Sequence, residues 1–299
     1  MLTRRLLLAA ALAVAATATP AAAQTKLPVV ATFSILGDFV KNVGGDRVAL
    51  VTLVGPDGDA HVYSATPADA KRVTDAKIVF INGLGFEGWI ERLIKASGTK
   101  ASTVVTTKGV RTRKMTGEPG YGHDEIDPHA WQSVANAKIY VANVLEALVK
   151  ADPEGKSEYE ANARAYLGKL DALEKDIEET VARIPPARRK IITSHDAFGY
   201  FKAAYGIDFI APQGVSTESD ASARDVARII RQIKVQKIPA VFLENVSDPR
   251  LIRRIADETG ARIGGTLFSD ALSGVQGPAA TYIDMMRHNL RQFAEALMS

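Results

Sequence analysis

Residues 190–206, KIITSHDAFGYFKAAYG, contain the pattern that decides the fold. The β-branched run at 191–193 is typical of a short buried strand. From Ala197 onward the apolar residues recur at helical spacing, and Gly206 is a typical helix stop. His195 therefore lies between a strand and a helix, at the carboxyl end of the strand. In open α/β sheets this is the end where ligands bind.

The same alternation of strand and helix continues on both sides of this stretch. We expect strands at 28–32, 47–54, 77–82, 207–211, 240–243 and 262–267. We expect helices at 35–43, from Thr66 onward, and at 86–95, 133–150, 222–234, 249–259 and 279–298, with a loop at 108–127. Strands that alternate with helices predict mostly parallel sheets covered on both faces, which is an α/β fold.

A long helical pattern separates the two series. Between Lys156 and Ile184 the apolar residues follow a three-four repeat, and Pro185 ends the pattern. We therefore expect two similar lobes joined by one long helix. The predicted division is residues 24–152 for the N-terminal lobe, 153–186 for the linking helix and 187–299 for the C-terminal lobe.

Residues 1–23 are typical of a secretory signal peptide. They contain the basic pair Arg4-Arg5, an apolar run at 6–16 and small residues at 20–23. The apolar run is too short to span a bilayer. The arginine pair leaves both the general and the twin-arginine export route open.

Charge and cysteine content narrow the class of protein further. Removing residues 1–23 lowers the formal net charge from +3 to +1, because this segment contains two arginines and no acidic residue. No basic cluster follows, so we expect no nucleic-acid partner. The sequence has no cysteine, so it forms no disulfide and offers no thiol for a lipid. We expect a free, monomeric periplasmic protein.

Three of the five histidines, His61, His129 and His195, lie in loops beside predicted strands or helices. A single loop histidine most often binds only the backbone. Asp270 ends another strand, where an aspartate also serves as a helix cap or turn former. Together, three imidazoles and one carboxylate form a four-ligand set that zinc accepts, whereas calcium and magnesium prefer oxygen ligands. Spacing alone does not establish such a site, because more than sixty residues separate each ligand from the next.

Several segments resemble, in order, the metal-binding segments of the zinc/manganese class of solute-binding proteins of ABC transporters, the TroA/ZnuA-like group. They are GPDGDAHVYSATPAD (55–69), NGLGFEGW (82–89), DPHAW (127–131), TSHDAFGYFKAAYG (193–206), QGVSTESDASARD (213–225) and LFSDAL (267–272). The resemblance covers essentially the whole chain after the signal peptide. It implies two α/β lobes with a metal ion in the cleft between them. It also implies a receptor that delivers the ion to an ABC permease in the membrane. Whether a metallochaperone loads the receptor stays open.

Carried over residue by residue, the resemblance assigns His61 and His129 to the first lobe, and His195 and Asp270 to the second. Family members have histidine or glutamate at the position of His195. Imidazole there favours Zn²⁺ over Mn²⁺, since manganese prefers more oxygen ligands. We therefore expect zinc, with a manganese- or iron-preferring receptor as the alternative. Imidazole ligands must lose protons to bind metal, so affinity should weaken between about pH 7 and 5.

The chain departs from the family pattern in two places. Many zinc receptors have a histidine-rich loop before the second ligand, whereas residues 117–127 contain only His123. We expect this loop to be solvated rather than metal-recruiting. Ala60 and Ser64 also replace commoner residues beside His61. His288, on the polar side of the last predicted helix, is expected at the surface.

A zinc hydrolase is the alternative from another class. A catalytic zinc usually has three protein ligands and one open position for water. Four ligands would close the site, and only Glu244 lies near enough in the pattern to act as a base. We expect Glu244 to close the lobes or to support a ligand instead. We also expect small lobe shifts on metal binding, since a rigid helix joins the lobes.

Overall fold

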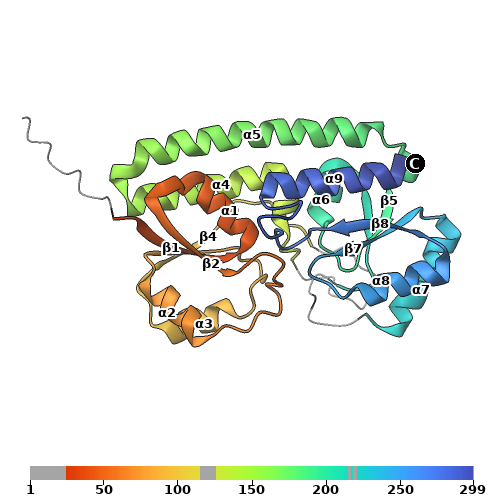
Figure 1. Cartoon of the computed structure of the whole chain (residues 1–299), viewed down its shortest axis with the longest axis horizontal. Coiled ribbons are helices and arrows are strands. Elements are labelled where there is room, and N and C mark those ends of the chain that lie inside the picture. The colour runs from red at the N-terminus through yellow and green to blue at the C-terminus, as the bar shows by residue number, and fades with distance from the viewer. Residues whose placement is uncertain (1–24, 115–125, 215–216, 218–220, 299) are drawn as a thin grey trace, which may run out of the picture.

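A computed structural model describes residues 25–114, 126–214, 217 and 221–298 (Figure 1). The strands are β1 (Leu27–Phe33), β2 (Val48–Val54), β3 (Ile78–Ile81), β4 (Ser102–Val105), β5 (Lys190–Ile192), β6 (Asp208–Ile210), β7 (Ala240–Glu244) and β8 (Arg262–Leu267). The helices are α1 (Ser34–Gly44), α2 (Pro67–Asp75), α3 (Ile90–Ser97), α4 (Val134–Ala151), α5 (Lys156–Arg183), α6 (Gly199–Tyr205), α7 (Ala223–Gln236), α8 (Pro249–Thr259) and α9 (Tyr282–Met298). Strand and helix alternate, as the sequence predicts.

The strands form two parallel four-stranded sheets with one topology. The first sheet has the order β2-β1-β3-β4 and the second has the order β6-β5-β7-β8. In each sheet the first strand in sequence pairs with the second strand on one side and with the third strand on the other, and the fourth strand lies beyond the third. The expectation of an α/β protein with two similar lobes is confirmed. We call the part that contains β1–β4 the first unit, and the part that contains β5–β8 the second unit.

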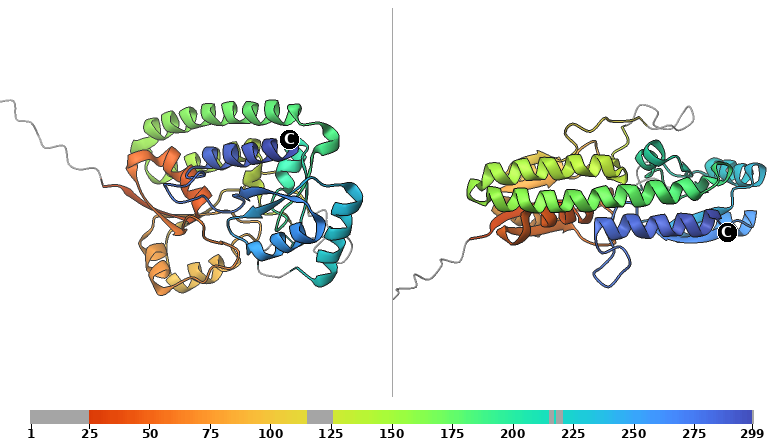
Figure 2. Two further views of the ribbon diagram at one scale, coloured as in Figure 1. Left: turned by 45° about the vertical axis from the view of Figure 1, so that its right-hand side comes forward. Right: turned by 90° about the horizontal axis from the view of Figure 1, so that it is seen from above.

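Helix α5 runs along both units (Figures 1 and 2). It has 28 residues, which corresponds to a length of about 42 Å. Its apolar stripe is buried, as the three-four repeat predicts: Tyr159, Ala163, Tyr166, Leu170, Leu173, Ile177 and Val181. The predicted linking helix is confirmed, while the boundaries 24–152, 153–186 and 187–299 stay a prediction.

Helix α9 also lies along α5 and reaches α1 of the first unit (Figure 1). One continuous buried apolar cluster extends from the first sheet through α5 and α9 into the second unit. A smaller cluster, including Ile229, Ile233 and Ile252, fills the space between the second sheet and helices α7 and α8. The units are thus joined by a shared core in addition to the linking helix. A shared core resists wide separation of the units, because separation would expose apolar surface.

The largest differences from the sequence prediction lie in two elements. Strand β4 was not predicted; its residues are mostly half-buried or exposed, as expected for the edge of a sheet. Helix α3 begins at Ile90 rather than at residue 86, because residues 86–89 continue the turn that starts at Gly83. Phe86 N–H donates to the Gly83 carbonyl at 3.1 Å, and the Glu87 carboxylate accepts the backbone N–H of Asn82 at 2.7 Å.

The helix ends also test the sequence reasoning. Thr66 caps the start of α2 as expected, and its side chain forms a complete capping box with that of Asp69. Ser133 occupies the N-cap position of α4, but its side chain makes no capping hydrogen bond. Helix α6 starts at Gly199, two residues after the predicted start, and ends at Gly206 with a φ of 80°.

Some expectations fall outside the described part of the chain. These are the signal peptide at 1–23 and most of the loop at 108–127, including His123. The two ends of that loop meet in an antiparallel bridge between Lys114 and Ile126. Among the described residues, no helix combines the length and the apolar composition needed to cross a bilayer.

Candidate metal centre

The four side chains predicted as ligands come together between the two sheets. His61 lies in the loop between β2 and α2, and His129 lies just before the short 3-10 turn Ala130–Gln132 that leads into α4. In the second unit, His195 follows the last residue of β5 by three positions, and Asp270 follows the last residue of β8 by three. One ligand atom from each of these four residues lies within 4.8 Å of the others.

The shortest separations all involve the Nε2 atoms of the rings. Asp270 Oδ2 lies 3.0 Å from His195 Nε2 and 3.3 Å from His61 Nε2. His129 Nε2 lies 3.6 Å from Asp270 Oδ1 and 3.3 Å from His61 Nε2. Three imidazole nitrogens and both carboxylate oxygens therefore surround a common point.

His129 is fully buried and is oriented by Asp127. Asp127 Oδ1 accepts the backbone N–H of His129 at 3.0 Å and lies 2.9 Å from its Nδ1. A proton on Nδ1 leaves Nε2 free to face the site. Burial lowers the pKa of His129, but the carboxylates of Asp270 and Asp127 outweigh burial and raise the pKa to about 9.

His195 has the corresponding partner in Glu244, at the end of β7. Glu244 Oε1 accepts the backbone N–H groups of Ser194 at 2.6 Å and of His195 at 3.0 Å. Its Oε2 lies 2.7 Å from His195 Nδ1, a charge contact by distance although its angle is not that of a hydrogen bond. Burial opposes protonation of His195, but Glu244 and Asp270 raise the pKa of its imidazole well above the usual value. Glu244 thus contacts a proposed ligand, which is the supporting role considered from the sequence.

His61 has a different environment. The ring of Phe86 meets its ring edge-on, with 4.7 Å between the centroids. Asp59 Oδ1 accepts the backbone N–H of His61 at 2.9 Å rather than an N–H of the ring. Burial lowers the pKa of His61 below its usual value, although Asp270 acts in the opposite direction. His61 is therefore the proposed ligand that is neutral and ready to bind.

Asp270 is fully buried, and its Oδ1 has no hydrogen-bond partner in the described part of the chain. Burial alone would raise the pKa of Asp270, but His195 and His129 hold it well below its usual value. A buried anionic oxygen without a donor is costly unless a cation meets it. The donor set, with three nitrogens and one carboxylate, suits zinc and other divalent transition ions.

Sequence reasoning missed several residues that shape this centre. Phe86, in the run NGLGFEGW, and Asp127, in DPHAW, lie in segments that were singled out, but no role was assigned to either. The pairing of Asp127 with His129 could have been inferred from their spacing of two residues, whereas the Phe86 contact has no local signal. His288 is not a free surface residue as expected: it is half-buried, and its Nε2 lies 2.9 Å from the carbonyl oxygen of Thr266.

Comparisons with known proteins find relatives along almost the whole chain. Residues 29–296 match the family model described as "ZnuA: Zinc-uptake complex component A periplasmic". The chain is 35% identical over 272 residues to the manganese-binding lipoprotein MntA of Halalkalibacterium halodurans, covering 91% of this chain and 88% of that protein. It is 33% identical over 276 residues to the iron-binding protein YfeA of Yersinia pestis, covering 92% and 88%. The solved periplasmic zinc binding protein TroA of Treponema pallidum matches with a TM-score of 0.85 at 32% identity, covering 91% of this chain and 99% of that one.

Proposed function

Because the chain belongs to the family of ZnuA periplasmic zinc-uptake components, and so is a metal-binding receptor of an ABC transporter, we propose that it captures Zn²⁺ and delivers the ion to the membrane permease. The proposed ligands are His61, His129, His195 and Asp270. The observation that carries the proposal is the convergence of these four side chains from four distant segments.

The choice of zinc depends on the donor set. Three neutral imidazoles and one carboxylate provide more nitrogen than manganese prefers, whereas zinc binds such a set in tetrahedral geometry. The relatives named above include manganese-, iron- and zinc-binding proteins, so sequence similarity alone does not select the ion. Mn²⁺ is the second candidate, supported by the manganese-binding MntA relative.

We place the protein in the periplasm as a monomer, exported through residues 1–23. The MntA relative is named a lipoprotein, but the sequence of this chain has no cysteine to accept a lipid. We therefore propose that it reaches its permease without a lipid on cysteine. A metallochaperone that loads the site is a further proposed partner.

The hydrolase alternative is not supported, because the family consists of transport receptors and not of enzymes. The site geometry agrees. Glu244, the candidate base, already contacts His195 and two backbone N–H groups. Both of its carboxylate oxygens are thus engaged in contacts that support a proposed ligand.

The test is elemental analysis of the protein purified from the periplasm, followed by competition titration of Zn²⁺ against Mn²⁺. We expect one equivalent of zinc per chain, displaced by manganese only at large excess. His288→Ala is the matched control, because this imidazole contacts a carbonyl oxygen outside the four-residue set. Displacement of zinc by comparable concentrations of manganese would refute the choice of zinc.

A further inference from the structure

One backbone carbonyl, that of Ser269, accepts two hydrogen bonds from the other side of the metal centre. Trp131 Nε1 donates to it at 2.9 Å and Gln132 Nε2 donates at 2.8 Å. All three residues are fully buried. The two donors lie two and three residues after His129, and the acceptor directly precedes Asp270.

We propose that Trp131 and Gln132 are positioning residues that hold Asp270 beside His129 before any ion binds. This inference rests on the proposed metal-receptor function. It assigns them a task that neither performs as a ligand: they tie the backbone of one proposed ligand to the backbone of another. The proposed ligands His129 and Asp270, which belong to different units, thereby stay side by side without metal.

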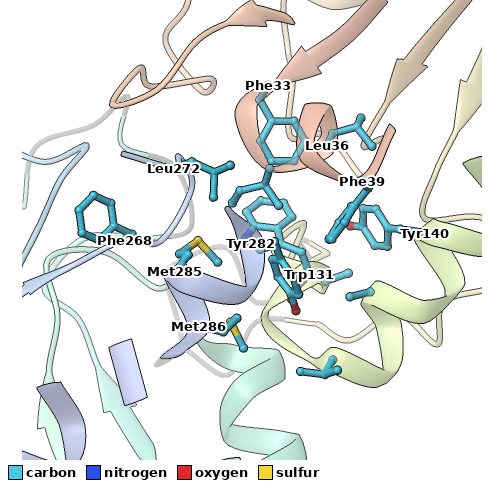
Figure 3. Close-up of a cluster of buried hydrophobic side chains, with 14 of the residues drawn as sticks. Phe33, Leu36, Phe39, Trp131, Tyr140, Phe268, Leu272, Tyr282, Met285 and Met286 are labelled. Atoms are coloured by element: carbon cyan, nitrogen blue, oxygen red, sulfur yellow. The ribbon is translucent and has the colours of Figure 1, made fainter. Parts of the chain in front are cut away.

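Trp131 is fixed at both ends, which makes its indole N–H a rigid donor. Its ring packs against Phe33 and Phe86, with centroid distances of 5.1 and 4.8 Å. Its own carbonyl oxygen accepts the hydroxyl of Tyr282 at 2.6 Å. Figure 3 shows Trp131 and Tyr282 in one apolar cluster with Phe33, where the first unit meets α9. The indole cannot turn away from Ser269 without disrupting this packing.

Gln132 is a polar side chain that stability alone does not account for. Its amide nitrogen donates to Ser269, but its Oε1 has no hydrogen-bond partner among the described residues. A buried unpaired oxygen destabilises a fold, and an apolar side chain of the same length would avoid that cost. A donor for the Ser269 carbonyl is what glutamine supplies here and an apolar residue does not.

Helix α9 holds the same segment from the opposite side. Asn289, also buried, donates its Nδ2 to the Phe268 carbonyl at 2.7 Å and accepts the Phe268 N–H with its Oδ1 at 3.0 Å. The backbone before Asp270 is thus held by α9 and by the Trp131–Gln132 pair. If the two units separated at this point, the Ser269 carbonyl would lose both of its donors.

The other tryptophan of the sequence makes the same kind of bond in the first unit. Trp89 Nε1 donates to the carbonyl oxygen of Ala60 at 2.8 Å, directly before His61. The sequence has two tryptophans, and each indole N–H holds the carbonyl that precedes a proposed ligand. Trp89 acts within one unit and Trp131 acts between two, so Trp89 provides a matched control.

The test is a mutant cycle on Zn²⁺ affinity, measured by competition with a chromogenic chelator. We expect Trp131→Phe and Gln132→Met each to raise the Kd about two- to threefold, because the remaining donor still satisfies the carbonyl. The double variant should raise it about tenfold or more, since the buried carbonyl then has no donor. In an Asp270→Ala background the same double variant should raise the Kd by a smaller factor, about two- to threefold, because the Trp131 ring also packs against that of His129 at 5.3 Å. Trp89→Phe should still weaken binding in that background, because it acts through His61.

Two controls separate positioning from general stability. Asn162→Ala removes a comparable amide–carbonyl bond, that of Asn162 Nδ2 to Val43 at 3.1 Å, and should leave the Kd unchanged. Circular dichroism of the metal-free variants checks folding; if the double variant does not fold, the two single variants are measured in the same cycle. Equal effects with and without Asp270, or no effect on Kd in either background, would overturn the inference. Failure of the unmutated protein to bind Zn²⁺ or Mn²⁺ would instead refute the proposed function.

Discussion

The two units have the same strand order but present their proposed ligands differently. In the second unit, His195 and Asp270 each lie three residues after a strand, so the register of the sheet fixes their position. In the first unit, His61 lies seven residues after β2, and His129 lies at the end of the long connection from β4 to α4. A ligand on a long loop needs other contacts to hold it, and here Phe86, Asp127 and the Ser269 carbonyl provide them. The comparison teaches that one topology can support both a sheet-fixed and a contact-fixed half-site.

The sharpest test of this comparison is the loss of Asp270, the sheet-fixed carboxylate. Asp270→Ala removes the negative charge that faces all three imidazoles. We expect the Zn²⁺ Kd to rise by more than about 100-fold, beyond the 10- to 100-fold typical of residues behind the ligands. His61→Ala should raise the Kd by a smaller factor, since it removes a neutral ligand from the contact-fixed half-site of the first unit. Competition titration measures both; equal losses would show that the halves are energetically equivalent.

The pH dependence of affinity is the next largest effect. With a pKa of about 9, His129 stays protonated in the metal-free protein up to that pH, and the pKa of His195 is also raised. An ion must displace these protons, so affinity should rise with pH through 9, by up to about tenfold per unit for each proton released. The expected weakening thus begins above the window of pH 7 to 5 that free imidazole predicts.

The same shifts predict an opposite trend for the metal-free fold. A raised histidine pKa contributes stability that is fully present below the unfolded pKa of about 6.5 and is lost as the pH rises through 9. The rise in melting temperature caused by zinc should therefore grow between pH 6.5 and 9. Thermal melts with and without metal check this. An affinity that is constant from pH 6 to 8 would contradict the raised values.

The two orienting carboxylates provide a more moderate comparison between the units. Asp127→Asn and Glu244→Gln should each weaken Zn²⁺ binding about 10- to 100-fold, because a neutral amide orients imidazole less firmly. We expect the larger effect for Glu244→Gln, since Glu244 accepts two backbone N–H groups, those of Ser194 and His195, whereas the Asp127 carboxylate accepts only that of His129. Asp75→Asn, at an exposed pair with Lys71, is the matched control. A larger loss of Zn²⁺ affinity for Asp127→Asn would show that Asp127, and not Glu244, is the more important orienting carboxylate.

Among the comparisons in this series, the smallest effect is expected for Phe86, the apolar neighbour of His61. Phe86→Leu keeps an apolar side chain but removes the ring edge that meets the imidazole. Aromatic pairs of this kind contribute about 0.5–1.5 kcal/mol, so the Kd should rise about two- to tenfold. Phe209→Leu, in an aromatic cluster of the second unit, should leave the Kd unchanged. Weakening by Phe209→Leu as well would indicate a general loss of packing.

Local signals were enough to predict most of the fold. The run at 191–193, the cap at Thr66 and the repeat in α5 each specify their element through residues next to them in sequence. Strand β4 was missed because an edge strand has no strong apolar pattern. The predicted start of α3 was wrong because the Glu87 side chain turns back to accept the backbone N–H groups of Asn82 and Gly83, which keeps residues 86–89 in a turn.

The candidate site was harder to predict from the sequence than the fold. Each ligand lies beside a strand or helix, which the patterns show, but their convergence depends on how two sheets face each other across a shared core. Only the family resemblance linked His61, His129, His195 and Asp270. The Trp131–Ser269 contact joins positions 138 residues apart, so no periodicity in the sequence could reveal it.

The most direct measurement is a crystal structure of the zinc-loaded protein with anomalous data collected at the zinc edge. We predict a single anomalous peak between the two units, with Nε2 of His61, His129 and His195 and a carboxylate oxygen of Asp270 each about 2.0–2.2 Å from it. A peak elsewhere, or a zinc ion that lacks any one of these four ligands, would contradict the proposed centre.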